Sequence, residues 1–456
     1  MALARSWLVA RLGVLLLAVA CGEFFMDDAN AETPETNYDE ARVPKYTLPE
    51  LLKLNDGTPV ADADTWTKRR RGELLELFRA QVFGRSPGRP EGMRWKVTST
   101  DSNALDGLAT RKEITVLLLG DDKGPRLNLL LYVPNQAKRP APVILGYNFE
   151  GNHTVHADPG ITLASGWLPP KAKGLVDGDA TDASRGTSAG RWSVEYLLSR
   201  GYALATAYYG DIEPDHFSGW RAGIRDALLP SGELRSQTTS ASLDPGALLW
   251  EPPGAAADDC GAISAWAWGL SRAMDYLETD ADINPRQAIV FGHSRLGKTS
   301  LWAGAQDERF AIVISNDSGE GGAALARRCI GERVENLNKN FPHWFCGNFK
   351  QYSGHEDKLP VDAHELLALA APRPLYVASA SEDRWADPRG EFLAALAAEP
   401  AYRLFGLPGL GVSEWPPIDT PVGQTIGYHV RTGKHDVLPY DWTQYLNFAD
   451  RHFGRK

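Results

Sequence analysis

The stretch that decides the fold runs from residue 288 to residue 305 and reads AIVFGHSRLGKTSLWAGA. Its first half is an apolar run typical of a buried strand, and its second half is typical of a helix. Between them, Gly292, Ser294 and Gly297 fit the G-x-S-x-G pattern with one extra residue. A tight strand-to-helix turn lifts a serine hydroxyl above a sheet. The pattern therefore predicts a nucleophile at Ser294, with an ordinary strand–turn–helix of a Rossmann-like sheet as the alternative.

Strand-like and helix-like segments alternate around this stretch. Four strand-like runs between residues 94 and 149 come first, and strands then alternate with helices up to a closing helix. This order predicts a mostly parallel sheet with helices on both faces. We expect an α/β-hydrolase fold, a three-layer αβα sandwich with long loop insertions at about 160–190, 228–256 and 404–424.

The beginning of the chain is typical of an exported protein. A positively charged start precedes the apolar run LGVLLLAVA, which is short for a membrane span. We expect a signal peptide over residues 1–20, with cleavage before Cys21 or as late as after Ala31. The sequence AVAC loosely resembles a lipobox, so a lipid anchor on Cys21 is an alternative. Residues 32–456 are expected to form a single secreted or periplasmic catalytic domain with an extended N-terminal lead-in.

Composition and charge narrow the range of partners. The chain has 456 residues and a formal net charge of -10, and such an excess of negative charge argues against a nucleic-acid partner. The one dense basic run, at residues 68–71, fits a solvated helix face. No later segment is apolar enough to span a membrane.

The cysteines give no metal signature. No CxxC or His-rich spacing suggests a metal site, and none is expected. Cys260, Cys329 and Cys346 cannot all pair with one another, and a disulfide between Cys329 and Cys346 is one alternative in an oxidising compartment.

A serine nucleophile needs a base. In α/β-hydrolases the acid and then the histidine follow the serine along the chain. His435 lies in TGKHDVLPYDW, after a predicted final strand at residues 426–432 and before the final helix. Alternation places the nearby His429 within that strand. We therefore predict His435 as the base.

Two loops offer the acid that would orient His435. Glu382 and Asp383 follow the strand-like run PLYVASA, whereas Asp317 and Glu320 follow the run AIVIS. Both loops lie at the carboxyl ends of strands, where α/β active sites form. The usual hydrolase acid follows the later strand, which favours Asp383, and Asp317 remains the alternative.

Several motifs together resemble one family. G-x-S-R-L-G-K, S-N-D-S-G-x-G-G-A-A-L, S-E-D-x-W-A-D-P-x-G-E-F and G-x-H-D are similar to motifs of the glucuronoyl esterases, carbohydrate esterase family 15. The resemblance extends from FRAQVFGRSP to the C-terminus and includes YNFEGNHT and YYGDIEPD. The long intervening loops resemble those of bacterial members.

The resemblance implies roles for individual residues. Ser294 and His435 match the family's nucleophile and base, and Arg295 matches the arginine that helps to hold the oxyanion. Three further residues are implied to contact the sugar: Lys298, Glu332 and Trp385.

Two positions depart from the fungal pattern. His293 stands where fungal members have a cysteine, which removes a disulfide to the histidine region. Asp317 stands where they have a Glu, which is longer by one methylene. This difference favours Asp383 as the acid that orients His435, although both residues could contact His435.

The implied reaction is hydrolysis of an ester between a glucuronic acid and an alcohol, through an acyl-enzyme on Ser294. In plant walls this is 4-O-methylglucuronate of glucuronoxylan joined to lignin alcohols. We expect a monomer that needs no metal or organic cofactor. The alternatives are an acetyl-type carbohydrate esterase and a non-catalytic wall-binding protein with a hydrolase fold.

Overall fold

A ten-stranded sheet organises the computed structural model, which describes residues 36–228, 252 and 254–455. Its strand order is β1-β2-β3-β7-β4-β8-β9-β10-β12-β11. The strands are β1 (Arg94–Ala104), β2 (Ala109–Leu117), β3 (Arg126–Pro134), β4 (Ala141–Asn148), β7 (Ala203–Tyr208), β8 (Ile283–His293), β9 (Ile312–Asn316), β10 (Leu375–Ala380), β11 (Val422–Gly423) and β12 (Ile426–Arg431).

The sheet changes from antiparallel to parallel along its width. β1, β2, β3 and β7 pair antiparallel, the six strands from β7 to β12 run parallel, and β11 closes the edge antiparallel to β12. Short connections join β1 to β2 and β2 to β3, which suits antiparallel pairing, whereas each parallel strand needs a crossover that is usually helical. The mostly parallel sheet expected from the sequence is confirmed.

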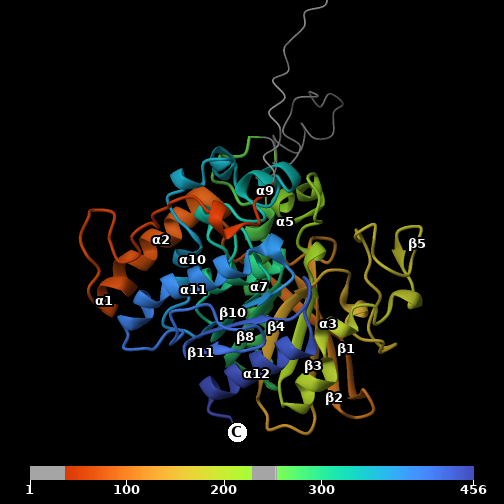
Figure 1. Cartoon of the computed structure of the whole chain (residues 1–456). Coiled ribbons are helices and arrows are strands. Elements are labelled where there is room, and N and C mark those ends of the chain that lie inside the picture. Colours follow the sequence, from red (N-terminus) through yellow and green to blue (C-terminus); the bar gives the residue numbers. More distant parts are fainter. Residues whose placement is uncertain (1–35, 229–251, 253, 456) are drawn as a thin grey trace, which may run out of the picture. The chain divides into compact units, whose positions relative to one another are not determined.

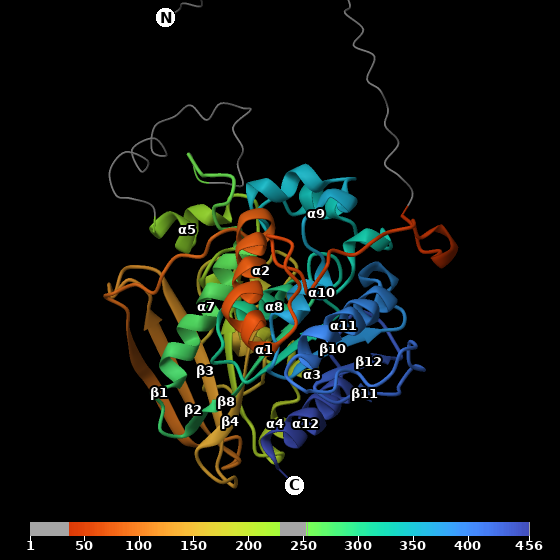
Figure 2. The same cartoon turned by 90° about the vertical axis from the view of Figure 1, so that its left-hand side faces the viewer.

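Helices cover both faces of this sheet (Figures 1 and 2). Successive residues of the central strands alternate between two apolar clusters, as Ala203 and Leu204 of β7 do. One cluster includes residues of α7 (Ala262–Leu277), α8 (Arg295–Gln306), α10 (Ala363–Ala368) and α11 (Pro388–Arg403), and the other includes residues of α3 (Ala189–Trp192), α4 (Val194–Ser199) and α12 (Pro439–Phe453). The result is the expected three-layer αβα sandwich.

A continuous helical stretch precedes the first strand. It comprises α1 (Ala63–Thr65), a π-helical turn (Trp66–Arg70), α2 (Arg71–Phe78) and a second π-helical turn (Arg79–Phe83). Phe83 stacks on Trp302 of α8 at a ring-centroid distance of 4.6 Å. The lead-in therefore contributes aromatic side chains to the same core as α8, the helix that follows Ser294.

The basic run in this stretch is only partly solvated, which corrects the expectation. Arg70 is buried and donates to Glu365 of α10 at 3.0 Å, and Arg71 donates to the carbonyl oxygen of Ala305 at 2.7 Å. Lys68 and Arg69 are exposed. Two of the four cations thus fasten the lead-in to α8 and α10.

The expected long loops contain only short elements. The insertion at 160–190 contains a two-stranded sheet formed by β5 (Leu175–Val176) and β6 (Asp179–Ala180), and the insertion at 404–424 contains β11. Most of the insertion at 228–256 and the whole expected signal peptide lie outside the described residues. Two further short helices are α5 (Ile224–Ala227), which follows β7 along the chain, and α9 (Val334–Asn340), which follows β9.

Cys329 is a free thiol, so the disulfide considered between Cys329 and Cys346 does not form. Among the described residues, no helix is both long and apolar enough to cross a membrane.

Candidate active site

The predicted nucleophile lies on a sharp turn between β8 and α8. Ser294 has φ 59° and ψ -129°, a conformation that side-chain-bearing residues rarely adopt. A Cβ on Gly292 would lie 1.8 Å from the Leu296 carbonyl oxygen, and one on Gly297 would lie 2.9 Å from Ser318 Cβ. Only glycine fits at these two positions, which explains the spacing of the motif.

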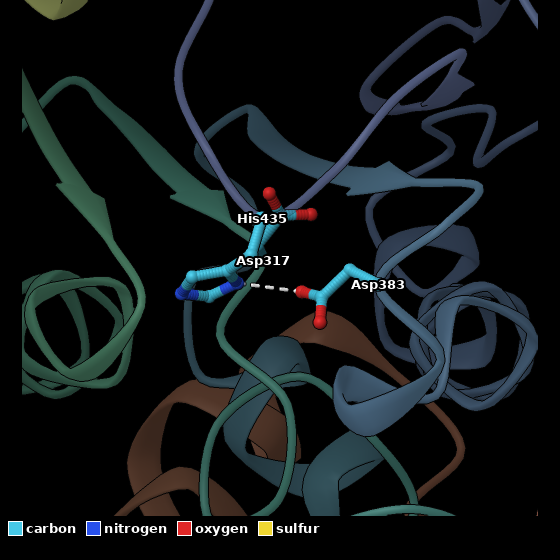
Figure 3. A group of neighbouring side chains, drawn as sticks. All are labelled: Asp317, Asp383 and His435. Atoms are coloured by element: carbon cyan, nitrogen blue, oxygen red, sulfur yellow. Dashed lines mark hydrogen bonds and ion pairs between the residues drawn. The ribbon is translucent and has the colours of Figure 1, made fainter.

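His435 lies in the loop between β12 and α12, and its side chain is 40% exposed. Its Nδ1 is 2.6 Å from Oδ2 of Asp383, which follows β10 and is buried (Figure 3). Nδ1–H donates to this carboxylate, which leaves Nε2 free for another partner. The pair has the geometry by which a carboxylate orients a general base.

A third group, Asp317 from the loop after β9, approaches the same pair. Oxygen atoms of Asp317 and Asp383 and a ring nitrogen of His435 lie within 4.8 Å of one another. Two ligands of one tetrahedral zinc lie roughly 3.3 Å apart, given metal–ligand bonds of about 2.0 Å. The 2.6 Å contact between His435 and Asp383 therefore fits a hydrogen bond better than shared metal coordination.

The eight residues that the sequence analysis favours for catalysis or sugar contact line one pocket of about 420 Å³. They are Ser294, Arg295, Lys298, Asp317, Glu332, Asp383, Trp385 and His435. Glu320, by contrast, lines a small cavity of about 20 Å³ beside α10 and does not reach the site. The pocket thus joins the predicted nucleophile and base to the groups expected to contact a sugar.

Known proteins share this architecture and sequence. A family model described as "Glucuronyl esterase, fungi" matches residues 237–406. The carbohydrate esterase MZ0003 of an unknown prokaryotic organism is 46% identical over 426 residues, covering 93% of this chain and 94% of that protein. The glucuronoyl esterase structure from Solibacter usitatus is 48% identical with a TM-score of 0.83, covering 91% of this chain and 100% of that one.

A promiscuous CE15 esterase from a marine bacterial metagenome has 46% identity and a TM-score of 0.82, covering 92% of this chain and 100% of that one. The chain belongs to carbohydrate esterase family 15, the glucuronoyl esterases. It is accordingly a carboxylic ester hydrolase, and the resemblance stated from its motifs is confirmed.

In this glucuronoyl esterase, Lys298 lies one turn along α8 from Ser294. Its Nζ donates to the Ser318 carbonyl oxygen at 2.6 Å and lies 3.4 Å from Oε2 of Glu332. Lys298 and Glu332 are both buried, whereas Trp385 is 38% exposed at the rim. A buried cation and anion with an open aromatic face suit a ligand that carries several hydroxyl groups.

The loop that carries His435 is shaped by a buried ion pair. Arg431 Nε donates to Asp441 Oδ2 at 2.8 Å, and its Nη2 donates to the carbonyl oxygens of Lys434 and Asp436 at 2.9 and 2.5 Å. These carbonyls flank His435. Asp441 also accepts from the buried His429 at 2.8 Å, within the strand where alternation placed that residue. The position of the imidazole thus depends on Arg431.

Several pocket residues escaped the sequence analysis. Asn340, Phe341 and Trp344 line the pocket from α9 and the turn after it. The aromatic run FPHWF at 341–345 was the signal available, but aromatic residues serve more often in cores. Asp215 belongs to the YYGDIEPD segment, but the sequence predicted no role for it. In the structure it accepts hydrogen bonds from the Arg295 guanidinium and from Trp344 Nε1.

Asp317 differs from Asp383 in having no hydrogen-bond partner for either carboxylate oxygen. The nearest cation, Arg431 Nη2, is 3.7 Å away. Burial, together with the nearby Glu391 and Asp383 carboxylates, raises the pKa of Asp317 well above its usual range. The folded state therefore favours a neutral Asp317.

This pKa shift predicts a stability gain for Asp317→Asn. Because the folded pKa is raised, the folded protein loses stability as pH rises from the unfolded pKa of Asp towards the folded one. At pH 8 the neutral variant should be more stable than the wild type, and the gain should shrink towards pH 4.5. Urea unfolding at several pH values measures it. Asp383→Asn, which loses a hydrogen-bonded carboxylate, is the control, and an equal gain there would contradict the argument.

Proposed function

We propose that this protein hydrolyses esters between the carboxyl group of 4-O-methylglucuronic acid and an alcohol, through an acyl-enzyme on Ser294. One observation carries the proposal above all. The strained Ser294 and the His435–Asp383 pair line the same pocket as Lys298, Glu332 and Trp385. The chemistry of acyl transfer and the groups that suit a sugar therefore share one cavity.

In the proposed reaction, His435 carries each proton. His435 Nε2 takes the proton of Ser294 Oγ as Oγ attacks the ester carbonyl carbon. His435 then returns that proton to the departing alcohol oxygen, and the acyl-enzyme remains. A water oxygen then attacks the acyl carbon while His435 Nε2 takes a proton from that water. The bond between the acyl carbon and Ser294 Oγ breaks, Oγ takes the proton back from His435, and the glucuronic acid leaves with its free carboxyl group. Asp383 stabilises the imidazolium in both halves.

Arg295 is proposed to stabilise the oxyanion of the tetrahedral intermediates. It follows Ser294 at the first position of α8, where the backbone N–H groups have no acceptor within the helix. A guanidinium and N–H groups at that point would bind charge that develops only in the transition state.

The sugar would bind at the other end of the pocket. Lys298 Nζ and the Glu332 carboxylate offer a donor and an acceptor to ring hydroxyls, and Trp385 offers an aromatic face to the ring. In this arrangement the sugar is on the acyl side, so it stays bound to the protein after the alcohol leaves.

The natural substrates proposed are ester links between glucuronoxylan and lignin alcohols in plant cell walls. Such polymers cannot enter a cell, which agrees with export directed by a signal peptide over residues 1–20, or with a lipid anchor at Cys21. Residues 32–456 would then act outside the cytoplasm as one monomeric catalytic domain.

A broader carbohydrate esterase activity is the second candidate. The similar esterase from a marine bacterial metagenome is described as promiscuous. An acetyl esterase would use Ser294, His435 and Asp383 but would not need Lys298 and Trp385 to hold an acyl-side sugar. Substrate preference separates the two candidates.

We expect the purified protein to hydrolyse the methyl ester of 4-O-methylglucuronate with a higher kcat/KM than acetylated xylose. Ser294→Ala should lower kcat by several orders of magnitude, because the nucleophile is lost while the fold remains. Ser199→Ala, which removes an exposed hydroxyl from α4, is the matched control. Near-normal turnover by Ser294→Ala would exclude the serine mechanism, and preference for the acetylated sugar would favour the second candidate.

Loss of Lys298 should affect substrates unequally. Lys298→Ala removes a buried cation that faces the proposed sugar site, so kcat/KM for the glucuronate ester should fall by about 10-fold or more, as for a lost hydrogen bond to a charged group. Turnover of 4-nitrophenyl acetate, which carries no sugar, should fall far less. Equal losses on both substrates would indicate a structural lysine instead.

The two acidic residues should differ in kcat. Asp383→Asn should cost up to about 10⁴-fold, as in the serine proteases, because an amide favours the wrong imidazole tautomer. Asp317→Asn should cost much less, since that group makes no hydrogen bond to His435. Initial rates for both variants and the double variant, with circular dichroism to check folding, make the comparison. A larger loss from Asp317→Asn would assign the acid to the earlier strand.

A further inference from the structure

Asp215 follows β7 in the segment YYGDIEPD and is almost fully buried, with 2% of its side chain exposed. Its carboxylate accepts hydrogen bonds from four side chains. Oδ2 accepts from Arg295 Nη1 and from the Tyr209 hydroxyl at 3.0 Å. Oδ1 accepts from Trp344 Nε1 at 2.7 Å and from His343 Nε2 at 2.8 Å. Every lone-pair direction of this carboxylate is thereby occupied.

The partner of interest is Arg295, whose side chain is only 30% exposed. Its guanidinium lies over three rings, at 4.8 Å from the Trp344 centroid, 5.6 Å from Phe341 and 5.9 Å from Phe149. Aromatic faces attract a cation but do not fix its rotation, because the attraction has no hydrogen-bond direction. The Asp215 carboxylate is the only charged acceptor bonded to this guanidinium among the described residues.

Asp215 keeps its charge despite its burial. Burial alone would raise the pKa of Asp215, but the hydrogen bond from His343 and the charge of Arg295 outweigh it and hold that pKa well below the usual range. An ionised, fully bonded carboxylate is a fixed anchor, because any displacement would break several charge-assisted hydrogen bonds at once.

We propose that Asp215 is a positioning residue that aims the Arg295 guanidinium at the oxyanion formed on the ester carbonyl carbon. The proposal rests on the proposed function, in which Arg295 stabilises that oxyanion. Asp215 itself does not line the pocket with Ser294. It bonds two residues of that pocket, Arg295 and Trp344, and we assign its effect on the transition state to Arg295, so its loss should lower kcat and leave KM nearly unchanged.

A double-mutant cycle separates this role from a merely structural one. In the wild-type background, Asp215→Asn keeps the shape, removes the charge and should lower kcat by about 10²-fold, the scale of a lost oxyanion donor. KM for the methyl glucuronate ester should change by less than about 3-fold. In the Arg295→Ala background, the same substitution should lower kcat by less than about 3-fold further, because the group it aims is gone.

Asp211→Asn is the matched control. Asp211 lies four residues earlier, and its side chain is engaged by Asn128, with Oδ2 accepting from the backbone N at 2.9 Å and from Nδ2 at 3.0 Å. It makes no contact with Arg295, so its variant should keep kcat within about 3-fold of wild type. A loss there equal to that of Asp215→Asn would overturn the proposal in favour of general loosening of this segment.

A milder variant keeps the test informative if Asp215→Asn does not fold. Tyr209→Phe removes one of the four hydrogen bonds and retains the ring, so kcat should fall by about 2- to 5-fold, and not at all further in the Arg295→Ala background. Equal losses with and without Arg295, or a rise in KM at constant kcat, would refute the proposal. If Arg295→Ala alone retains wild-type kcat, the oxyanion role itself fails, and that outcome is distinct from independence of Asp215 and Arg295.

Discussion

The left-handed backbone of Ser294 is the constraint on which the rest of the site depends. A residue with φ 59° between a strand and a helix stores strain of about 1–3 kcal/mol, and here it persists because neighbouring backbone holds it. The N–H of Ser294 donates to the Asn316 carbonyl oxygen at 2.9 Å, and Gly292 lets the first turn of α8 approach β8 closely. The hydroxyl is thereby raised above the sheet edge where β9, β10 and β12 also end.

That shared edge explains why residues far apart in the chain meet. Parallel strands deliver their following loops to one side of the sheet. Asp317, Asp383 and His435 each follow a different strand and converge within 4.8 Å (Figure 3). The sheet order, with β9, β10 and β12 adjacent, is therefore what assembles the acid and the base.

Three buried carboxyl groups show how their partners determine charge in this site. Asp215 has four donors and a lowered pKa, whereas Asp317 has none and a raised one. Burial raises the pKa of Glu391 to about 8, although Ser379 and the Gly319 N–H donate to it. The charge beside the guanidinium is thus fixed, while Asp317 and Glu391 favour their neutral forms. This difference concentrates negative charge where it orients cations.

The sequence by itself determined the strand-to-helix turn that carries Ser294, the alternating order of strands and helices, and the family. These are local properties, because the glycine spacing and the apolar runs act over a few neighbouring residues. The sequence also predicted the position of His435, because the apolar pattern of the last strand shows where that strand ends.

Only the tertiary structure decided which partners each side chain meets. Asp383 and Asp317 follow neighbouring parallel strands, yet the Asp383 carboxylate bonds the imidazole and the Asp317 carboxylate has no hydrogen-bond partner. Arg70 was read as solvated but is buried against Glu365, nearly 300 residues away. Asp215 accepts a hydrogen bond from Arg295 because the loop after β7 packs against the start of α8. Contacts between distant segments depend on the packing of whole layers, and no local pattern encodes them.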